Sequence, residues 1–286
     1  MNGIDEYRNR IICGDNVMVM QEFPGDCIDL TVTSPPYDNL RDYKGYTFDF
    51  EGVAEQLFRI TKPGGVVVWV VGDATIKGSE TGTSFRQALH FKDIGFRLHD
   101  TMIYQKLSGG ATGSNLCYIQ SFEYMFVLSK GKPGAINLIY DRKNVVGKKE
   151  KIESPGRRFK TGETKPRRLV KRNEVGRRFN IWGYYTGVES QIKTQHPAIF
   201  PDALARDHII SWSNPGDLIL DPMCGSGTTC KKAKELGRDY IGIDVSSEYC
   251  AITEKRIAFI DYYGKPTEAL GSTPPINFME MKGKDG

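Results

Sequence analysis

The sequence lacks the features that define several large classes of protein. Its longest uninterrupted apolar run, from Val66 to Val71, is far shorter than the roughly 20 residues of a membrane-spanning helix. The first ten residues contain no apolar signal-peptide core, so we expect a cytoplasmic protein without a membrane partner. The 6 cysteines form no Cys-x-x-Cys pair and the 4 histidines have no metal-ligand spacing. The pattern therefore favours neither a disulfide framework nor a metal site.

Charge is unevenly distributed along an otherwise ordinary composition. The 286 residues are 39% hydrophobic and 26% charged, with a formal net charge of +4, which is typical of a globular protein. Residues 142–178 hold 15 Lys and Arg against 4 Asp and Glu, whereas the rest of the chain holds 24 against 31. A basic segment in a mildly acidic chain indicates a surface for a polyanion such as nucleic acid, or else a solvated loop.

Strand and helix patterns alternate on both sides of this basic segment. We expect strands at 29–33, 66–71, 98–105, 122–129, 218–220 and 240–243, and helices at 50–61, 83–95, 202–212, 228–236 and 246–262. In the helix at 83–95, Phe85, Ala88 and Leu89 are expected to face inward. The alternation predicts one parallel sheet assembled from both halves of the chain. The basic insert would cover its carboxyl edge, where such sheets bind ligands.

A glycine-rich turn follows the predicted strand at 218–220. It reads Asp221-Pro222-Met223-Cys224-Gly225-Ser226-Gly227-Thr228-Thr229. Glycines let the backbone approach a ligand closely, and the N–H groups of a helix N-terminus favour an anionic group. Asp244, 19 residues after Gly225, ends the next strand and suits the two hydroxyls of a ribose. Neither Gly-x-Gly-x-x-Gly nor Gly-x-x-x-x-Gly-Lys-(Ser/Thr) occurs here. A nucleoside without phosphates therefore fits best, with an ordinary turn as the alternative.

A second motif, Thr33-Ser34-Pro35-Pro36-Tyr37, ends the strand at 29–33. Its prolines fix the backbone and have no N–H to donate. The Ser34 hydroxyl and the Pro35 carbonyl can therefore point into a pocket together, as acceptors for a planar NH₂ group, with Tyr37 as a stacking surface. A Pro-Pro strand terminator without function is the alternative.

Together the two motifs resemble those of the DNA amino-methyltransferases that use S-adenosylmethionine. In that family an (Asp/Asn/Ser)-Pro-Pro-(Tyr/Phe/Trp) tetrapeptide is catalytic. A second motif, Asp-Pro-Phe-x-Gly-Ser-Gly-Thr-Thr, lines the methionine end of the cofactor, and Met223 stands here in place of the usual Phe. The catalytic motif precedes the cofactor motif by almost 190 positions, with the basic segment between them. This order resembles the circularly permuted β class, and the resemblance extends over roughly residues 11–260.

The resemblance implies an α/β fold: a Rossmann-like methyltransferase sheet, mostly parallel and circularly permuted, with helices on both faces and a basic insert. The catalytic half is expected at 1–140, the basic target-recognition insert at 141–190, the cofactor half at 191–263 and a loose tail at 264–286.

The resemblance also implies the residues of the site. Catalytic roles fall on Ser34, Pro35, Pro36 and Tyr37, and Asp73 either supports the target pocket or caps a loop. The residues assigned to the cofactor are Asp15, Phe200, Asp221, Pro222, Cys224, Gly225, Ser226, Gly227, Thr228 and Asp244. Of these, Asp15 would lie near the adenine, Phe200 would cover the methionine and Asp244 would bind the ribose.

The predicted chemistry is methyl transfer to an exocyclic amino group of a DNA base, with neither a metal ion nor a covalent intermediate. The amino nitrogen is a poor nucleophile because its lone pair is delocalised into the ring. Hydrogen bonds to Ser34 Oγ and the Pro35 carbonyl would favour a pyramidal nitrogen, which attacks the sulfonium methyl group in line. The base must first be flipped out of the duplex and stacked on Tyr37. Methylation at carbon-5 of cytosine needs a Pro-Cys nucleophile, and none of the cysteines follows a proline.

The target base and the substrate class have alternatives. Serine at the first catalytic position resembles the cytosine-N4 enzymes more than the adenine-N6 enzymes, so cytosine N4 is favoured and adenine N6 stays open. Methyltransferases for RNA or for a protein glutamine share a Pro-Pro-aromatic motif, but they normally have the cofactor motif first. A non-catalytic nucleic-acid-binding module would need the basic segment alone.

Double-stranded DNA is the partner that the resemblance implies, bound through phosphate and base contacts from the basic insert. The residues expected at the DNA are Arg157, Arg158, Lys160, Arg167, Arg168, Lys171, Arg172, Arg177 and Arg178. A homodimer is implied by the β class alone. A bacterial, archaeal or phage-encoded chain of this kind works either with a restriction endonuclease that acts on the same site or on its own.

Overall fold

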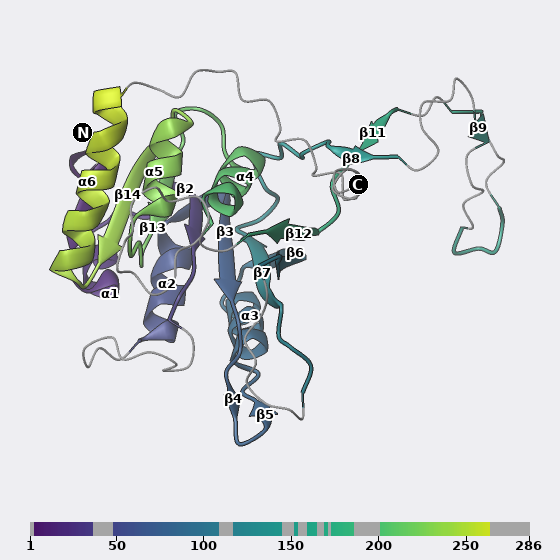
Figure 1. The fold of residues 1–286 in the computed structure, drawn as a ribbon, viewed down its shortest axis with the longest axis horizontal. Coiled ribbons are helices and arrows are strands. Elements are labelled where there is room, and N and C mark those ends of the chain that lie inside the picture. Colours follow the sequence, from purple (N-terminus) through teal and green to yellow (C-terminus); the bar gives the residue numbers. More distant parts are fainter. Residues whose placement is uncertain are drawn as a thin grey trace, which may run out of the picture. The chain divides into compact units, whose positions relative to one another are not determined.

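Strands from both ends of the chain pair in one eight-stranded sheet, in the order β1-β14-β13-β2-β3-β7-β6-β12 (Figure 1). Their bounds are β1 (Arg10–Cys13), β2 (Ile28–Thr33), β3 (Thr61–Val71), β6 (Arg97–Lys106), β7 (Phe122–Ser129), β12 (Ile181–Tyr184), β13 (Leu218–Asp221) and β14 (Asp239–Asp244). Every neighbouring pair in this sheet is parallel except the two that include β7. The predicted mostly parallel sheet from both halves of the chain is thus confirmed.

The computed structural model describes residues 3–36, 48–108, 117–144, 152–153, 159–164, 169–170, 173–185 and 201–263. These residues fall into two units. The first comprises Met1–Ile139 and Phe179–Tyr263, and the described residues of the second lie within Tyr140–Arg178. The helices of the first unit are η1 (Asp5–Tyr7), α1 (Asn16–Gln21), α2 (Phe50–Ile60), α3 (Thr83–Asp93), α4 (Asp202–Trp212), α5 (Thr228–Glu235) and α6 (Ser247–Tyr263).

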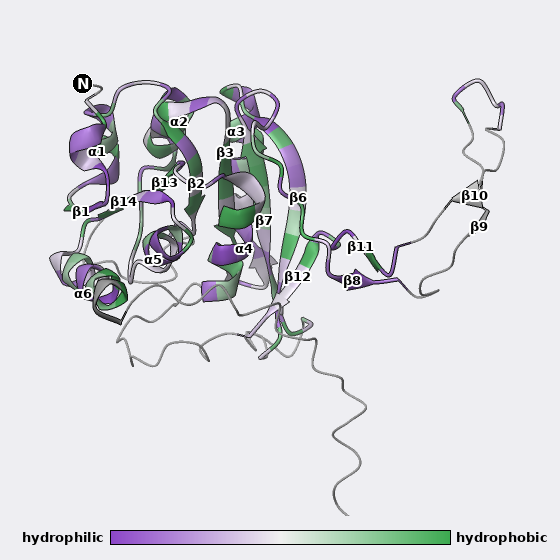
Figure 2. Cartoon of the chain, turned by 90° about the horizontal axis from the view of Figure 1, so that it is seen from above, coloured by the Kyte–Doolittle hydropathy of each residue, from purple (hydrophilic) through white to green (hydrophobic). Residues whose placement is uncertain are grey.

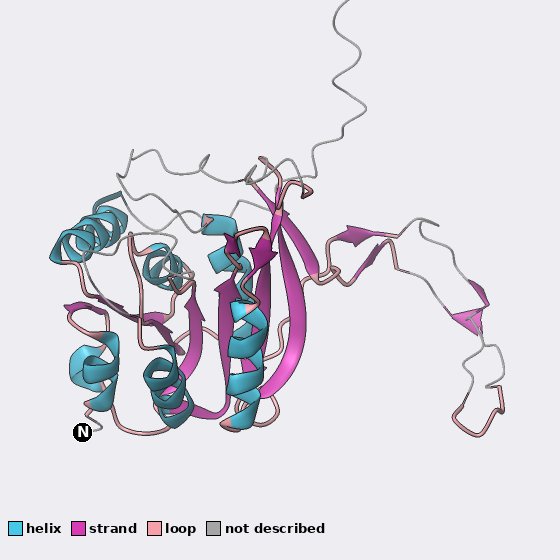
Figure 3. Cartoon of the chain, turned by 90° about the horizontal axis from the view of Figure 1, so that it is seen from below, coloured by secondary structure: helices cyan, strands magenta, loops and turns pink. Residues whose placement is uncertain are grey.

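Helices cover both faces of the central sheet. Helices α1, α2 and α3 lie on one face, and α4, α5 and α6 lie on the other (Figures 2 and 3). Each set contributes apolar side chains to the core on its own side of the sheet. Leu57 of α2 packs in the first of these two cores, and Leu204 of α4 packs in the second. The run Val66–Val71 in β3 is buried throughout, as expected for a strand between two helical layers. This arrangement bears out the predicted Rossmann-like architecture.

One helix presents a different face to the core from the one predicted. The pattern placed Phe85 and Leu89 inward, but in α3 they are 50% and 58% exposed. The helix buries Ser84, Gln87 and Phe91 instead. Gln87 can be buried because its Oε1 accepts a hydrogen bond of 2.8 Å from the Trp69 indole N–H, which satisfies a polar group inside the core. The expectation for Phe85 and Leu89 was therefore wrong.

Short strand pairs complete the described structure. In the first unit β4 (Thr75–Ile76) pairs with β5 (Ser79–Glu80). In the second unit β8 (Arg142–Lys143) pairs with β11 (Val175–Gly176), and β9 (Ile152–Glu153) pairs with β10 (Leu169–Val170), both antiparallel. Strand β12 pairs with β6 in the central sheet, although 141–190 was the expected extent of the insert. Strand β12 thus belongs to the first unit, and the bounds of the insert stay a prediction.

Within the residues that the structure describes, helices long and apolar enough to cross a membrane do not occur.

Candidate active site

The polar motifs follow neighbouring strands of the central sheet. The parallel register pairs Cys13 at the end of β1 with Asp244 at the end of β14, and Asp221 at the end of β13 with Gly242. On its other side β13 pairs with β2, which ends at Thr33. Because the carboxyl ends of parallel strands meet at one edge of a sheet, the catalytic and cofactor motifs lie next to each other there.

A hydrogen bond joins the two motifs directly. Thr33 Oγ1 donates to Asp221 Oδ1 at 2.8 Å, inside the protein. A second link runs from Thr229 Oγ1 to the Val32 carbonyl at 3.1 Å. The end of β2 is thereby tied both to the end of β13 and to the first turn of α5. Residues separated by 188 positions in the chain thus form one buried polar cluster.

Burial raises the pKa of the Asp221 carboxyl to about 6. Hydrogen bonds from the Thr33 hydroxyl and the Met223 N–H oppose this rise, and the nearby negative charge of Asp244 adds to it. A buried carboxylate is stabilised when it accepts hydrogen bonds, so these donors keep the buried acid ionisable. The cluster can therefore place a negative charge close to the glycine-rich turn.

The glycine-rich turn has the conformation that its sequence predicts. Gly225 and Gly227 both have positive φ, +51° and +77°, where other residues are strained. The Asp244 carboxylate accepts the Gly225 N–H at 2.8 Å through one oxygen and the Ser246 N–H at 2.8 Å through the other. A carboxylate oxygen can accept two hydrogen bonds, so these bonds leave Asp244 compatible with the hydroxyls of a ribose.

The other residues of this motif are buried within the same turn. Pro222, Cys224 and Thr228 are all buried, and burial raises the pKa of the Cys224 thiol well above its ordinary value. This thiol is therefore protonated at neutral pH, and its part in the site is to pack rather than to react.

The catalytic motif is only partly within the described residues. Pro35 is buried, while Ser34 and Pro36 are partly buried at the end of β2. Tyr37 lies outside the described residues, so its stacking role stays a prediction. The same holds for Phe200, the residue expected to cover the methionine.

Asp15 and Asp73 both cap helices. Asp15 accepts the Met18 N–H at 3.0 Å at the start of α1. It follows Gly14, whose N–H donates to the Asp244 carbonyl at 3.0 Å, so Asp15 lies near the end of β14, at the carboxyl edge of the sheet. Asp73 accepts the Ser84 N–H at 2.9 Å and the Ser84 hydroxyl at 2.5 Å. These contacts cap the start of α3, and support of a target pocket by Asp73 stays a prediction.

The described part of the second unit contains three of the predicted DNA-binding residues. Lys160 and Arg177 are exposed. Arg178 pairs with Asp141, with its Nε 3.1 Å and 2.9 Å from the two carboxylate oxygens. Among residues 140–178, this pairing neutralises one of the expected cations. The remaining six lie outside the described residues: Arg157, Arg158, Arg167, Arg168, Lys171 and Arg172.

Sequence reasoning missed the threonines that connect the site. Thr33 immediately precedes Ser34 and Thr229 ends the glycine motif, yet neither was assigned a role. A hydroxyl at the buried end of an apolar strand was the available signal, because a buried hydroxyl needs a partner. Across the described residues, groups of three or more His, Cys, Asp or Glu placed to hold a metal ion do not occur.

This arrangement of strands and motifs defines a class of enzyme. The model of a family described as DNA methylase matches residues 28–255, so the chain belongs to the DNA methylase family and is a DNA methyltransferase.

Particular relatives agree with the family assignment. The chain is 55% identical over 263 residues to the orphan methyltransferase M.BamHII of Bacillus amyloliquefaciens, covering 90% of this chain and 98% of that protein. In structure it resembles the cytosine-N4-specific PvuII DNA methyltransferase, with a TM-score of 0.62 at 20% identity over 86% of this chain and 85% of that one. It also resembles M1.HpyAVI in a complex with S-adenosylmethionine, with a TM-score of 0.61 at 22% identity over 87% and 98%.

Proposed function

We propose that this DNA methyltransferase moves a methyl group from S-adenosylmethionine to the exocyclic amino group of a flipped base, with cytosine N4 as the target. The observation that carries the proposal is the Thr33–Asp221 hydrogen bond of 2.8 Å, because it joins the motif that would hold the amino group to the motif that would hold the cofactor. Both motifs occur on a chain of the DNA methylase family. Family membership supports DNA over the RNA, protein and non-catalytic alternatives.

The residues at the cofactor edge fit S-adenosylmethionine in charge and shape. Asp244 offers a carboxylate for the ribose hydroxyls, and Asp15 lies at the end of the neighbouring strand for the adenine. Because Gly225 and Gly227 have no side chains, the backbone of the turn can approach the methionine end of the cofactor closely. Asp221 adds a buried negative charge that favours a cationic ligand. A resident metal ion has no part in the proposal.

The reaction itself needs little from the protein beyond positioning. S-adenosylmethionine supplies a methyl group on a sulfonium sulfur, which leaves as a neutral thioether. Ser34 Oγ and the Pro35 carbonyl accept the two N–H bonds of the amino group and hold its lone pair toward that methyl group. A nitrogen–carbon bond forms as the carbon–sulfur bond breaks. The methylated nitrogen, now positively charged, then loses one proton to solvent water by way of the Ser34 hydroxyl, which gives up its own proton as it accepts this one. Tyr37 would stack on the flipped base.

The choice of cytosine rests on Ser34, since a serine at this position resembles the cytosine-N4 enzymes. Adenine presents the same NH₂ geometry to Ser34 and Pro35, so adenine N6 is the second candidate. We also propose that the domain is circularly permuted, with the catalytic half before the basic insert and the cofactor half after it. The basic residues of 142–178 would bind phosphates and read base edges.

The proposal also covers the oligomeric state of the protein, its location in the cell and its relation to a restriction endonuclease. We expect a homodimer in the cytoplasm of the cell that encodes the chain. Because the relative M.BamHII is named an orphan methyltransferase, we favour action without a cognate endonuclease over membership of a restriction pair. Light scattering of the purified chain tests the dimer.

The experiment that tests the reaction is methyl transfer from labelled S-adenosylmethionine to unmethylated bacterial DNA, followed by mass separation of the nucleosides. N4-methylcytosine is the expected product. N6-methyladenine would overturn the assignment of the base while supporting the machinery. Label on RNA but not on DNA would overturn the substrate class.

A further inference from the structure

Helix α6 holds the glycine-rich turn through two side chains that are one helical turn apart. Thr253 Oγ1 donates to the Gly225 carbonyl at 2.9 Å. The Thr253 methyl carbon Cγ2 lies 2.2 Å from the position that a Cβ on Gly227 would occupy, so this threonine fills the space beside the glycine. The turn therefore follows the surface of α6 closely, and residue 227 has no room for a side chain.

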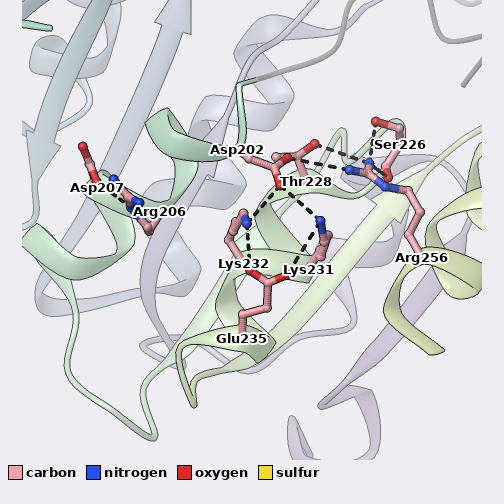
Figure 4. A network of polar contacts seen from close by, with 9 residues as sticks. All are labelled: Asp202, Arg206, Asp207, Ser226, Thr228, Lys231, Lys232, Glu235 and Arg256. Atoms are coloured by element: carbon pink, nitrogen blue, oxygen red, sulfur yellow. Dashed lines mark hydrogen bonds and ion pairs between the residues drawn. The ribbon is translucent and has the colours of Figure 1, made fainter. Parts of the chain in front are cut away.

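Arg256 is the second of these side chains. Its guanidinium is buried, and Nη1 donates to the Ser226 carbonyl, to Ser226 Oγ at 2.9 Å and to Thr228 Oγ1 at 3.4 Å (Figure 4). A buried arginine is rare unless charged or polar partners satisfy its donors. Here oxygens of the turn and of the first residue of α5 share the two hydrogens of Nη1.

These contacts fix the direction of the backbone in the turn. A peptide group is planar and trans, so its carbonyl and the following N–H point in opposite directions. Because the Gly225 carbonyl is held toward α6, the Ser226 N–H points away from α6. The Ser226 carbonyl is held in the same way by Arg256, and the Gly227 N–H is turned back onto the Cys224 carbonyl at 2.7 Å.

Asp202, at the start of α4, lies close to the contacts that Arg256 makes with the turn. Its carboxylate lies 3.8 Å from Arg256 Nη2, and 3.1 Å and 2.9 Å from the amines of Lys231 and Lys232 (Figure 4). Burial opposes ionisation of Asp202, but the two lysines outweigh it and lower its pKa. Asp202 is the first residue of α4 and comes two positions after Phe200. Asp202 and Arg256 thus link the start of α4 with the turn that precedes α5.

We propose that Arg256, assisted by Thr253, is a positioning residue for the cofactor, because the two side chains hold the Ser226 and Gly225 carbonyls toward α6 and thereby turn the Ser226 N–H toward the methionine end. The inference rests on the proposed function, in which the turn at Gly225–Gly227 binds S-adenosylmethionine. Arg256 acts through the backbone of the turn, and its guanidinium faces oxygens of the protein.

The sequence carries a signal for this role. The buried face of α6 includes Thr253, Ile257 and Ile260, and Arg256 lies on the same face at helical spacing. A basic residue in an apolar stripe needs an acceptor on the element beneath it.

The test compares four variants of the full chain: Arg256→Met, Arg256→Lys, Thr253→Val and Lys255→Met. The last is a matched control, since Lys255 is an exposed neighbour on the same helix. Calorimetry gives the Kd for S-adenosylmethionine, and steady-state rates give KM for the cofactor and for DNA. Thermal unfolding reports whether each variant is folded at the assay temperature.

Arg256→Met is expected to raise the cofactor Kd and KM by on the order of tenfold or more, since charged hydrogen bonds are lost. Arg256→Lys keeps the charge opposite Asp202 and should recover part of this loss. Thr253→Val keeps the shape beside Gly227, so removal of its hydroxyl should cost a few-fold. KM for DNA should change in none of them, and Lys255→Met should behave as the wild type.

Asp244→Ala distinguishes the two ways in which this inference can fail. If Asp244→Ala weakens cofactor binding while all three variants at Arg256 and Thr253 bind it normally, the positioning role is wrong and those residues serve stability alone. If Asp244→Ala itself binds the cofactor normally, the proposed site is wrong. If Arg256→Met does not fold, the cofactor Kd of Arg256→Lys and of Thr253→Val distinguishes the same two outcomes.

Discussion

At the carboxyl ends of β2 and β13, polar groups are buried and bonded to one another, whereas in the described part of the second unit charged groups lie at the surface. Asp221 is 6% exposed and accepts a hydrogen bond from the Thr33 hydroxyl on another strand. Lys160 and Arg177 are exposed, and Arg178 pairs with Asp141, which is exposed as well. Buried hydrogen bonds fix distances to fractions of an ångström, while exposed charges act over the screening length of the solvent.

The comparison assigns different physical tasks to the two regions. Methyl transfer needs a nitrogen and a methyl carbon held in line, so preorganised buried groups suit it. Attraction of a duplex needs charge without fixed geometry, which a basic segment supplies. Changes in salt concentration, in a buried hydroxyl, in pH and in one surface ion pair should therefore affect the two regions to different extents.

The largest expected effect is that of salt on DNA binding. If several phosphates are neutralised by residues 142–178, DNA affinity should fall by roughly a hundredfold or more between 50 and 200 mM salt. Cofactor affinity should stay nearly constant over the same range, because buried interactions are screened little. Fluorescence anisotropy with labelled duplex and calorimetry with the cofactor measure the two. DNA binding that is insensitive to salt would contradict the role of the basic segment.

Thr33→Val should reduce kcat/KM by roughly tenfold, because it removes the bond between the two motifs at almost constant volume. Thr31→Val is the matched control. Thr31 lies two residues earlier on β2, and its buried hydroxyl has no hydrogen-bond partner within the described structure. That substitution should leave activity unchanged and stability equal or higher. Equal loss of activity in both variants would show that the Thr33–Asp221 bond has no special part.

The raised pKa of Asp221 predicts a pH-dependent stability. An acid with a pKa of about 6 when folded and near 4 when unfolded holds its proton longer in the folded chain. Its contribution to stability is thus present below pH 4, declines as the pH rises to 6, and is constant above that. Relative to the wild type, Asp221→Asn should therefore gain ~2 kcal/mol in unfolding free energy between pH 4 and 6. Urea unfolding at a series of pH values tests this; a constant difference would contradict it.

The smallest expected effect comes from the ion pair in the second unit. Asp141→Asn releases the Arg178 guanidinium, so DNA affinity at low salt should rise by a few-fold. Asp26→Asn is the control, since Asp26 forms a comparable ion pair with Lys130 at 2.7 Å in the first unit. Anisotropy titrations of both variants measure the difference. An equal rise in both would mean that net charge alone is responsible.

Much of the fold follows from local sequence patterns. The helix at 202–212 has the predicted bounds because its apolar spacing and the Pro201 before it are local signals. The glycine-rich turn and the strand-end acids were likewise found from the sequence, since each is encoded within one short segment. The roles of Tyr37 and Phe200 stay predictions.

The parts that could not be predicted depend on contacts between distant segments. Ser84 and Gln87 face inward in α3 because Asp73 and Trp69 satisfy them, and no local pattern shows those partners. Strand β12 is four residues long and follows a charged segment, so its pairing with β6 has little local signal. The Arg256 contacts also span separate helices.

The most direct test of the account measures cofactor binding and methyl transfer in Ser34→Ala, with Ser79→Ala as an exposed-serine control. In the proposed site the cofactor binds at the ends of β13 and β14, and the amino group of the base binds at the end of β2. Ser34→Ala should therefore bind S-adenosylmethionine with the wild-type Kd, yet form methylated nucleoside at a rate lower by on the order of a hundredfold. Wild-type transfer by Ser34→Ala, or loss of cofactor binding in a folded Ser34→Ala chain, would contradict this division of the site.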